Sequence, residues 1–301
     1  QSGENLPDSY YQQRFEVPPS SGFFMKPLDK KQTLGAYFSN VGMTYYKKSI
    51  GQASAKALVD LAVSYLSMAV QINPASIEAH NNLGNIFSEL KQYDSAIEQY
   101  LGALKYEPGN LSTLFNLGLV YVDSDNNDKA IETLLQVVQI DPGFLPGHRS
   151  LTQLFLNREN YISALLHLNK IVALEPEGVQ ARLMIAQVYM RLNHFELSLE
   201  SLKKAVSMFP ENSGVLAHLA ENYYRMGNFD MAIAQYHKLI EYHPENLEAY
   251  IQLGWTYYKK SKIPMAIAWT TRGLSEAEPH PQYVVVAHMN LGLYYLLDKK
   301  F

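Results

Sequence analysis

Residues Ile77 to Pro108 read IEAHNNLGNIFSELKQYDSAIEQYLGALKYEP, and this stretch decides the fold of the chain. Small residues alternate in it with large apolar ones, and it ends on a proline. Stepping along the chain by 34 residues meets a proline each time, at Pro74, Pro108, Pro142, Pro176, Pro210 and Pro244. A fixed period of this length indicates an array of structural repeats, each of which buries its apolar face against a neighbour.

Small and large residues recur at fixed positions of the repeat. When each periodic proline is numbered 32, full units begin at Ile77, Leu111, Leu145, Val179, Ser213 and Leu247. Position 8 is small in every unit, as Gly84, Gly118, Thr152, Ala186, Ala220 and Gly254. Apolar residues at positions 7 and 11 share one face of a first helix, because they are four residues apart. Each unit is therefore predicted to be a helical hairpin whose second helix ends at the proline.

The two ends of the chain depart from this pattern. Residues 1–34 contain four prolines and no period but several aromatic residues, so we expect an irregular N-terminal arm that lies on the array, with a disordered leader as the alternative. The array is expected over residues 35–301, with an eight-residue insertion near residues 47–56 of its first unit. An eighth unit restarts at about Val285 and contains only its first helix, so we expect the protein to continue beyond residue 301.

This pattern resembles the tetratricopeptide repeat (TPR) family over about nine-tenths of the chain. The resemblance is carried by Leu83, Gly84, Phe87, Ala96, Tyr100, Ala103 and Pro108 and by their counterparts in the other units. It implies an all-α fold: a right-handed superhelical solenoid of helix-turn-helix repeats, with about seven full repeats and the first helix of an eighth. It also implies that positions 2, 5, 6, 9, 12 and 13 of each first helix face a concave groove.

Three sets of side chains are expected in that groove. Asparagine offers both a hydrogen-bond donor and an acceptor to a peptide backbone, and a ladder of asparagines is formed by Asn40, Asn82, Asn116 and Asn290, with Asn81 and Asn85 alongside. One cation per unit at position 13 forms a basic row suited to an acidic segment, namely Arg191, Arg225 and Lys259. Aromatic and apolar anchors gather on the concave side of units six to eight, as Tyr224, Trp255, Tyr258, Met289 and Leu293. Each set also has a plainer interpretation. In that interpretation the asparagines are typical of the family, the cations form a solvated charged face, and a missing cap or the N-terminal arm covers the aromatic patch.

Composition and motifs argue against other classes of function. The net charge of -4 gives no basic field for nucleic acid, and no apolar run approaches about 18 uninterrupted residues, so membrane insertion is not expected. The chain has no cysteine, and His80, His148 and His288 all fall at position 4, a packing position, so we expect no metal site and no cofactor. Without a glycine-rich phosphate loop or a nucleophile elbow, no catalytic residue and no enzyme activity are expected.

We therefore expect a protein–protein interaction scaffold that binds an extended peptide or a partner protein in its groove. Two other classes of function stay open. The array could be the targeting region of a larger enzyme whose catalytic domain lies beyond residue 301, or a structural protein that self-associates through its uncapped C-terminal end. A first residue other than methionine and the absence of cysteine favour an exported or envelope protein of a bacterium over a cytoplasmic one.

Overall fold

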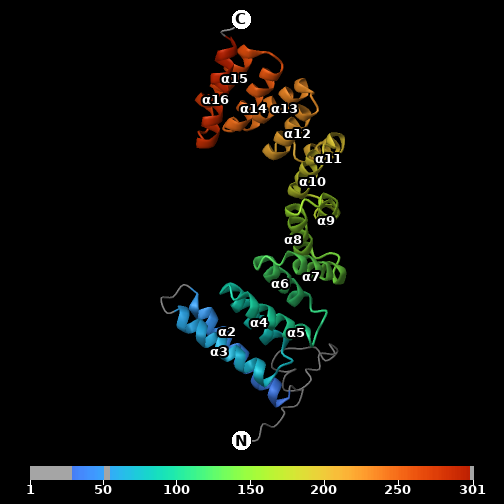
Figure 1. The fold of residues 1–301 in the computed structure, drawn as a ribbon, viewed down its shortest axis with the longest axis vertical. Helices are drawn as coiled ribbons and strands as arrows, with labels where there is room; N and C mark the ends of the chain where they lie inside the picture. Colours follow the sequence, from blue (N-terminus) through green and yellow to red (C-terminus); the bar gives the residue numbers. More distant parts are fainter. Residues whose placement is uncertain (1–28, 51–54, 299–301) are drawn as a thin grey trace, which may run out of the picture. The chain divides into compact units, whose positions relative to one another are not determined.

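The computed structural model describes residues 29–50 and 55–298, and within these ranges the chain forms fifteen helices and no strand (Figure 1). The all-helical class predicted from the sequence is confirmed. The helices are α2 (Lys30–Ser49), α3 (Ala55–Ile72), α4 (Ile77–Glu89), α5 (Tyr93–Leu104), α6 (Leu111–Asp123), α7 (Asn127–Ile140), α8 (Leu145–Asn157), α9 (Tyr161–Leu174), α10 (Val179–Arg191), α11 (Phe195–Met208), α12 (Ser213–Arg225), α13 (Phe229–Tyr242), α14 (Leu247–Lys259), α15 (Ile263–Glu276) and α16 (Pro281–Asp298).

Consecutive helices pair into hairpins, from α2 with α3 to α14 with α15, and α16 follows as a further first helix. The chain divides after Gly147 into two compact units, which are described separately below. The first unit contains α2 to α7, and the second contains α9 to α16 with most of α8. Figure 1 shows the pairing within each unit, for example α4 with α5 and α12 with α13.

The two helices of a hairpin approach closely because small residues lie between them. Position 20 is completely buried in each of the seven hairpins, as Ala62, Ala96, Ala130, Ala164, Ser198, Ala232 and Ala266. Where position 8 is glycine, the side chain at position 24 lies over it, as Leu66 over Gly42, Tyr100 over Gly84, Leu134 over Gly118 and Thr270 over Gly254. At Gly84 a Cβ atom would lie only 2.7 Å from Cε1 of the buried Tyr100 ring, so a larger residue does not fit there.

The turns between paired helices share one backbone conformation. Position 15 has a positive φ in the six units from α4 to α15, at Lys91 (58°), Asp125 (58°), Glu159 (55°), Asn193 (57°), Gly227 (76°) and Ser261 (58°). A residue in this left-handed region ends a helix because it turns the chain back over the last carbonyl groups. After Lys91, for example, the Gln92 N–H donates to Phe87 O at 2.8 Å. Only Gly227 among these residues adopts that φ without steric cost.

The first helix begins earlier than predicted. We expected the array to start at residue 35, whereas α2 starts at Lys30. Asp29 caps the helix by accepting from the Gln32 N–H at 2.7 Å, while the Gln32 side chain accepts from the Asp29 N–H at 3.0 Å. This reciprocal capping box fixes the start of the helix. The boundary of the predicted arm at residue 34 is therefore wrong, and the rest of that arm, residues 1–28, lies outside the described residues.

The predicted insertion near residues 47–56 lengthens two helices. α2 has 20 residues and α3 has 18, against 12 to 14 in the helices from α4 to α15, and only residues 51–54 of the insertion lie outside the described residues. With a mean hydropathy of 1.3, α3 is the one helix in the described ranges that is long and apolar enough to cross a membrane. It nevertheless forms half of a hairpin, in which Leu66 is completely buried over Gly42 of α2.

The last helix also begins earlier than expected. We placed the start of the eighth unit at about Val285, but α16 begins at Pro281. Proline is well suited to the first turn of a helix, because its ring fixes φ near the helical value and its missing N–H has no partner there in any case. The helix buries Ala287, Leu291 and Tyr294 against the hairpin of α14 and α15.

We expect Gly118→Leu to destabilise the fold by roughly 1–3 kcal/mol, because overpacking forces neighbouring side chains and backbone to shift. A Cβ at Gly118 would lie 2.8 Å from Cγ of Leu134, which is completely buried and cannot move aside. Thermal unfolding followed by circular dichroism measures the effect.

Gly292→Leu is the matched control for this prediction. Gly292 occupies position 8 of the eighth unit, but a Cβ atom there would meet no heavy atom within 4 Å among the described residues. Leucine is also a better helix former than glycine, so this variant should melt at the same temperature as the wild type or higher. A wild-type melting temperature for Gly118→Leu would contradict the register assigned to the repeats.

Candidate functional site

Most of the predicted asparagine ladder lies on first helices of the first unit. Asn40 is on α2 and is exposed, Asn82 and Asn85 are on α4, and Asn116 is on α6. Asn85 is exposed, whereas Asn82 and Asn116 are half-buried. We call Asn85, Asn116 and the neighbouring Asn81 the asparagine site.

The side chains of the asparagine site bind one another as well as facing solvent. The Asn85 carbonyl oxygen accepts from the Tyr100 hydroxyl at 2.6 Å and from the Asn116 amide at 3.1 Å. The Asn81 carbonyl oxygen accepts from the Thr113 hydroxyl at 2.9 Å. These bonds join the hairpin of α4 and α5 to α6. We expected each asparagine to offer a peptide both its carbonyl oxygen and its amide N–H groups. This expectation is wrong for Asn85, because its oxygen already accepts two hydrogen bonds.

The predicted aromatic anchors come together in the second unit. Tyr224 on α12 and Trp255 on α14 are half-buried, and both pack against the core of that unit. The Trp255 indole N–H donates to the Tyr224 hydroxyl oxygen at 2.9 Å. Because that oxygen acts as an acceptor, the hydroxyl proton of Tyr224 is available to a further acceptor. Tyr224 and Trp255 thus form a fixed pair that joins two successive first helices.

Two more rings and one cation extend this pair. The Tyr258 ring lies 5.0 Å from the Trp255 ring and 5.5 Å from that of the completely buried Tyr294 on α16, measured between centroids. The Lys259 ammonium lies 5.2 Å from the centroid of Trp255 and 5.8 Å from that of Tyr258, within the range of cation–π attraction. We call Tyr224, Trp255, Tyr258, Lys259 and Tyr294 the aromatic cluster.

The three cations of the predicted basic row differ in their surroundings. Arg191 and Arg225 are both exposed at the ends of their helices. Arg225 donates through Nε and Nη2 to the same Glu221 oxygen, at 2.9 and 2.8 Å, so its charge is balanced one turn away on the same helix. His218 and Arg225 hold the pKa of the Glu221 carboxyl below its usual value. The three cations of the predicted row thus differ: Glu221 balances Arg225, whereas Lys259 belongs to the aromatic cluster.

The sequence reasoning missed that groove-facing side chains pair between neighbouring hairpins. Three hydrogen bonds join residues 31 positions apart, and they are Asn116 to Asn85, Gln187 to His218 at 2.7 Å, and Trp255 to Tyr224. Polar or aromatic pairs at that spacing in the sequence would have identified them. Each bond orders two side chains that are at least partly exposed before any partner binds, which lowers the entropic cost of binding.

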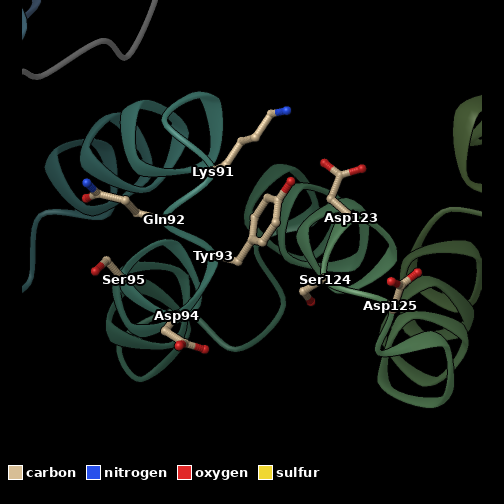
Figure 2. A pocket seen from close by; sticks show the side chains of 8 residues that line it. All are labelled: Lys91, Gln92, Tyr93, Asp94, Ser95, Asp123, Ser124 and Asp125. Atoms are coloured by element: carbon tan, nitrogen blue, oxygen red, sulfur yellow. The ribbon is translucent and has the colours of Figure 1, made fainter. Parts of the chain in front are cut away.

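A pocket of about 560 Å³ lies away from the predicted groove residues, at the turns of the second and third hairpins. It is shallow and lined by Lys91, Gln92, Tyr93, Asp94, Ser95, Asp123, Ser124 and Asp125. Figure 2 shows Tyr93 between the two turns, with Lys91 and Asp123 pointing to the same side and Asp94 and Ser95 pointing away. In the described parts of the chain, no group of three or more His, Asp or Glu side chains is arranged to hold a metal ion.

Two histidines form a buried pair between α8 and α9. The Nδ1 atoms of His148 and His167 lie 2.9 Å apart, so one of them donates and the other accepts. His167 also stacks on Phe155 with the ring planes 5° apart. Burial, with a smaller contribution from His148, lowers the pKa of His167 to about 4. The pair occupies positions 4 and 23, where His80 and Gln99 bond at 3.0 Å in the hairpin of α4 and α5.

We expect this pair to make stability depend on pH. Below pH 6.5 the unfolded chain binds a proton at His167 that the folded chain binds only near pH 4, so folding stability falls as the pH drops from 6.5 towards 4. The loss between pH 7 and pH 5 should be roughly 1–2 kcal/mol. Melting temperatures at the two pH values measure it.

His167→Gln reproduces the His–Gln pair of the α4–α5 hairpin and should remove most of this dependence. His194→Gln, at an exposed turn residue, is the matched control and should retain it. An equal pH dependence in His167→Gln and the wild type would refute the assignment.

Models of known families match both units of the chain. A model described as TPR repeat matches residues 84–125 and 220–261, and a model described as Tetratricopeptide repeat matches residues 111–144 and 179–212. The matched segments lie in hairpins whose register was predicted from the periodic prolines. No curated protein sequence matches the chain.

Solved structures of repeat proteins share the fold at low sequence identity. The C-terminal part of a TPR repeat-containing protein from Cytophaga hutchinsonii has a TM-score of 0.64 at 15% identity, over 84% of this chain and 98% of that one. A tetratricopeptide repeat protein from Parabacteroides merdae has a TM-score of 0.50 at 18% identity, over 87% and 99%. YrrB, described as a TPR protein with an unusual peptide-binding site, has a TM-score of 0.51 at 17% identity, over 61% and 95%. With their repeat register and helical hairpins, the matched residues 84–144, 179–212 and 220–261 are tetratricopeptide repeats.

Proposed function

We propose that this chain binds an extended segment of a partner polypeptide on the first helices of its hairpins, with the aromatic cluster as the principal anchor. In general terms, TPR proteins are non-catalytic scaffolds for protein interaction. The observation that carries the finer proposal is the half-exposed Trp255, held by its hydrogen bond to Tyr224 and covered on one side by Lys259. The similarly folded YrrB is described as having a peptide-binding site, which is compatible with this kind of function.

The chemistry of the aromatic cluster favours an acidic group next to an apolar side chain. Lys259 contributes a positive charge, and Tyr224 contributes a hydroxyl proton that is free to be donated. The faces of Trp255 and Tyr258 offer apolar area that loses little conformational entropy on binding, since both rings are already packed. A glutamate or aspartate that precedes or follows a large apolar residue would fit these groups.

The asparagine site supports contact with the peptide backbone. The Asn85 oxygen is engaged, but its amide N–H groups and the Asn116 carbonyl oxygen are a donor and an acceptor on neighbouring helices. A peptide amide needs this combination, whatever side chain it carries. The asparagine site and the aromatic cluster lie in different units, so each is proposed as a binding surface by itself.

We expect Trp255→Ala to weaken binding of an acidic–apolar peptide by roughly tenfold or more, because half-buried tryptophans in contact clusters carry much of the energy of an interface. The peptide is selected on an array that samples acidic and apolar neighbours, and its affinity is measured by isothermal titration calorimetry. Lys259→Gln should weaken binding several-fold and reduce its dependence on salt.

Tyr242→Ala is the matched control, since Tyr242 is also in the second unit and 45% exposed but lies at the end of the second helix α13. It should leave affinity unchanged. Circular dichroism must show that each variant remains folded. Equal affinity of Trp255→Ala and the wild type would remove the aromatic cluster from the binding surface, and unfolding of Trp255→Ala would show that the ring is part of the core.

A further inference from the structure

Two successive second helices of the second unit carry the same four residues. Met-Ala-Ile-Ala stands at residues 231–234 of α13 and again at residues 265–268 of α15, in both helices at positions 19 to 22 of the repeat. The alanine at position 20 is completely buried in both helices. The residues at positions 19 and 22 are exposed, and these are Met231, Ala234, Met265 and Ala268.

Positions 19 and 22 need not be apolar for a hairpin to form. Both are polar in two helices of the first unit, as Ser95 with Glu98 in α5 and Lys129 with Glu132 in α7. In α3, α9 and α11 one of the two is polar. The exposure in α13 and α15 is also present with the next first helix in place, since α16 packs against α14 and α15. Exposed apolar residues at both positions are thus particular to α13 and α15.

Aromatic side chains beside the repeated motif join α13 to α15. The His237 ring of α13 and the half-buried Trp269 ring of α15 lie 4.7 Å apart between centroids, with their planes 70° apart. His237 Nε2 lies 3.2 Å from the Tyr257 hydroxyl oxygen of α14. The two second helices therefore present one joined surface. We call Met231, Ala234, Met265, Ala268 and Trp269 the outer patch.

A row of cations runs beside the outer patch, at position 26. Each second helix of the second unit has an exposed cation there, and these are Lys170, Lys204, Lys238 and Arg272. The same position is uncharged in the first unit, where it is Met68, Gly102 and Gln136. The Arg272 guanidinium carbon lies 5.1 Å from the centroid of the Trp269 ring, so this cation borders the patch directly.

The carboxylates near the patch leave this positive charge available. Arg272 Nε donates to Glu276 at 2.8 Å, but both side chains of that pair are about half exposed. Exposed pairs of this kind contribute little free energy, so a carboxylate of another molecule can replace Glu276. Asp230, which directly precedes the motif of α13, is bonded to Lys260. The outer patch is therefore an apolar surface with a basic edge.

We propose that the outer patch binds an α-helix of another protein, and that the apolar side chains of this helix are flanked by carboxylates. The apolar side chains would cover Met231 and Met265, and the carboxylates would reach Lys238 and Arg272. The outer patch lies on second helices, whereas the aromatic cluster lies on first helices, so this inference does not rest on the function proposed above.

A helix suits the outer patch better than an extended segment does. The backbone groups of α13 and α15 are bonded within their own helices, so they offer an extended chain no main-chain hydrogen bonds. A helix satisfies its own backbone and needs only side-chain contacts. The short side chains of Ala234 and Ala268 let such a helix approach closely, and methionines adapt their shape to a partner.

A symmetric contact with a second copy of this chain fits the patch less well. It would bring Lys238 and Arg272 of one copy against the same cations of the other, and like charges opposed in an interface are unfavourable. An acidic partner gains from the same charges, which makes the charge of the partner the feature to test.

The test is binding of a dye-labelled peptide to the full chain, followed by fluorescence anisotropy. The peptide is an amphipathic helix of about five turns, with leucines at i, i+3, i+4 and i+7 spacing and glutamates beside them. We expect saturable binding to the wild type. Met265→Glu should weaken binding by roughly tenfold or more, because it removes an apolar contact and repels the glutamates.

A peptide with lysines in place of the glutamates tests the charge of the partner. It should bind the wild type more weakly than the acidic peptide does. The double variant Lys238→Gln/Arg272→Gln should lose most of this preference, because it removes the basic edge. An equal affinity of the wild type for the two peptides would contradict the proposed chemistry.

Met208→Glu is the matched control, since Met208 is 41% exposed, as Met265 is, but lies at the end of α11. It should bind the acidic peptide as the wild type does, and circular dichroism must show that both variants are folded. Absence of binding, or equal binding to Met265→Glu and the wild type, would overturn the proposal.

Two further outcomes would identify another occupant and overturn the proposal as well. Binding that is lost with Trp255→Ala but kept with Met265→Glu would place the peptide on the aromatic cluster, which would support the function proposed above instead. A concentration-dependent dimer that Met265→Glu abolishes would show that a second copy covers the outer patch.

Discussion

The close approach of two helices over a small residue is the contact on which each hairpin depends. It sets position 8 of the first helix against position 24 of the second, with the completely buried position 20 beside them. A glycine such as Gly118 is needed because the opposing side chain, Leu134, occupies the volume that a larger residue would take. Burial of apolar area then stabilises the pair, and the 34-residue period repeats this contact along the chain.

The same geometry leaves one face of each first helix available for function. Side chains on that face contact the next first helix through hydrogen bonds between residues 31 positions apart, such as Trp255 with Tyr224 and Asn116 with Asn85. These bonds combine two roles, because they join successive hairpins and hold the exposed groups in place. A binding surface ordered in this way loses less entropy when a partner binds than one built from free side chains.

Much of the fold could be predicted from local sequence. Prolines and small residues recur because each unit solves the same packing problem, so helix boundaries inside the array follow from the period. The predicted helix starts were wrong at the two ends of the array, where no neighbouring unit fixes the register. Asp29 and Gln32 start α2 through a capping box that the period does not contain, and Pro281 starts α16. The candidate site was predicted only in part, since residue types identified the groups on the first helices but not their partners.

The sequence by itself determined that the chain is a series of helical hairpins, because contacts within 34 residues are dictated by helical periodicity and by the size of the side chains. The tertiary structure decided which exposed groups are engaged. Glu221 balances Arg225, Lys259 lies over two aromatic rings, and no described residue fills the space over Gly292. These outcomes depend on rotamers and on distances between helices, which a residue's place in the repeat does not specify.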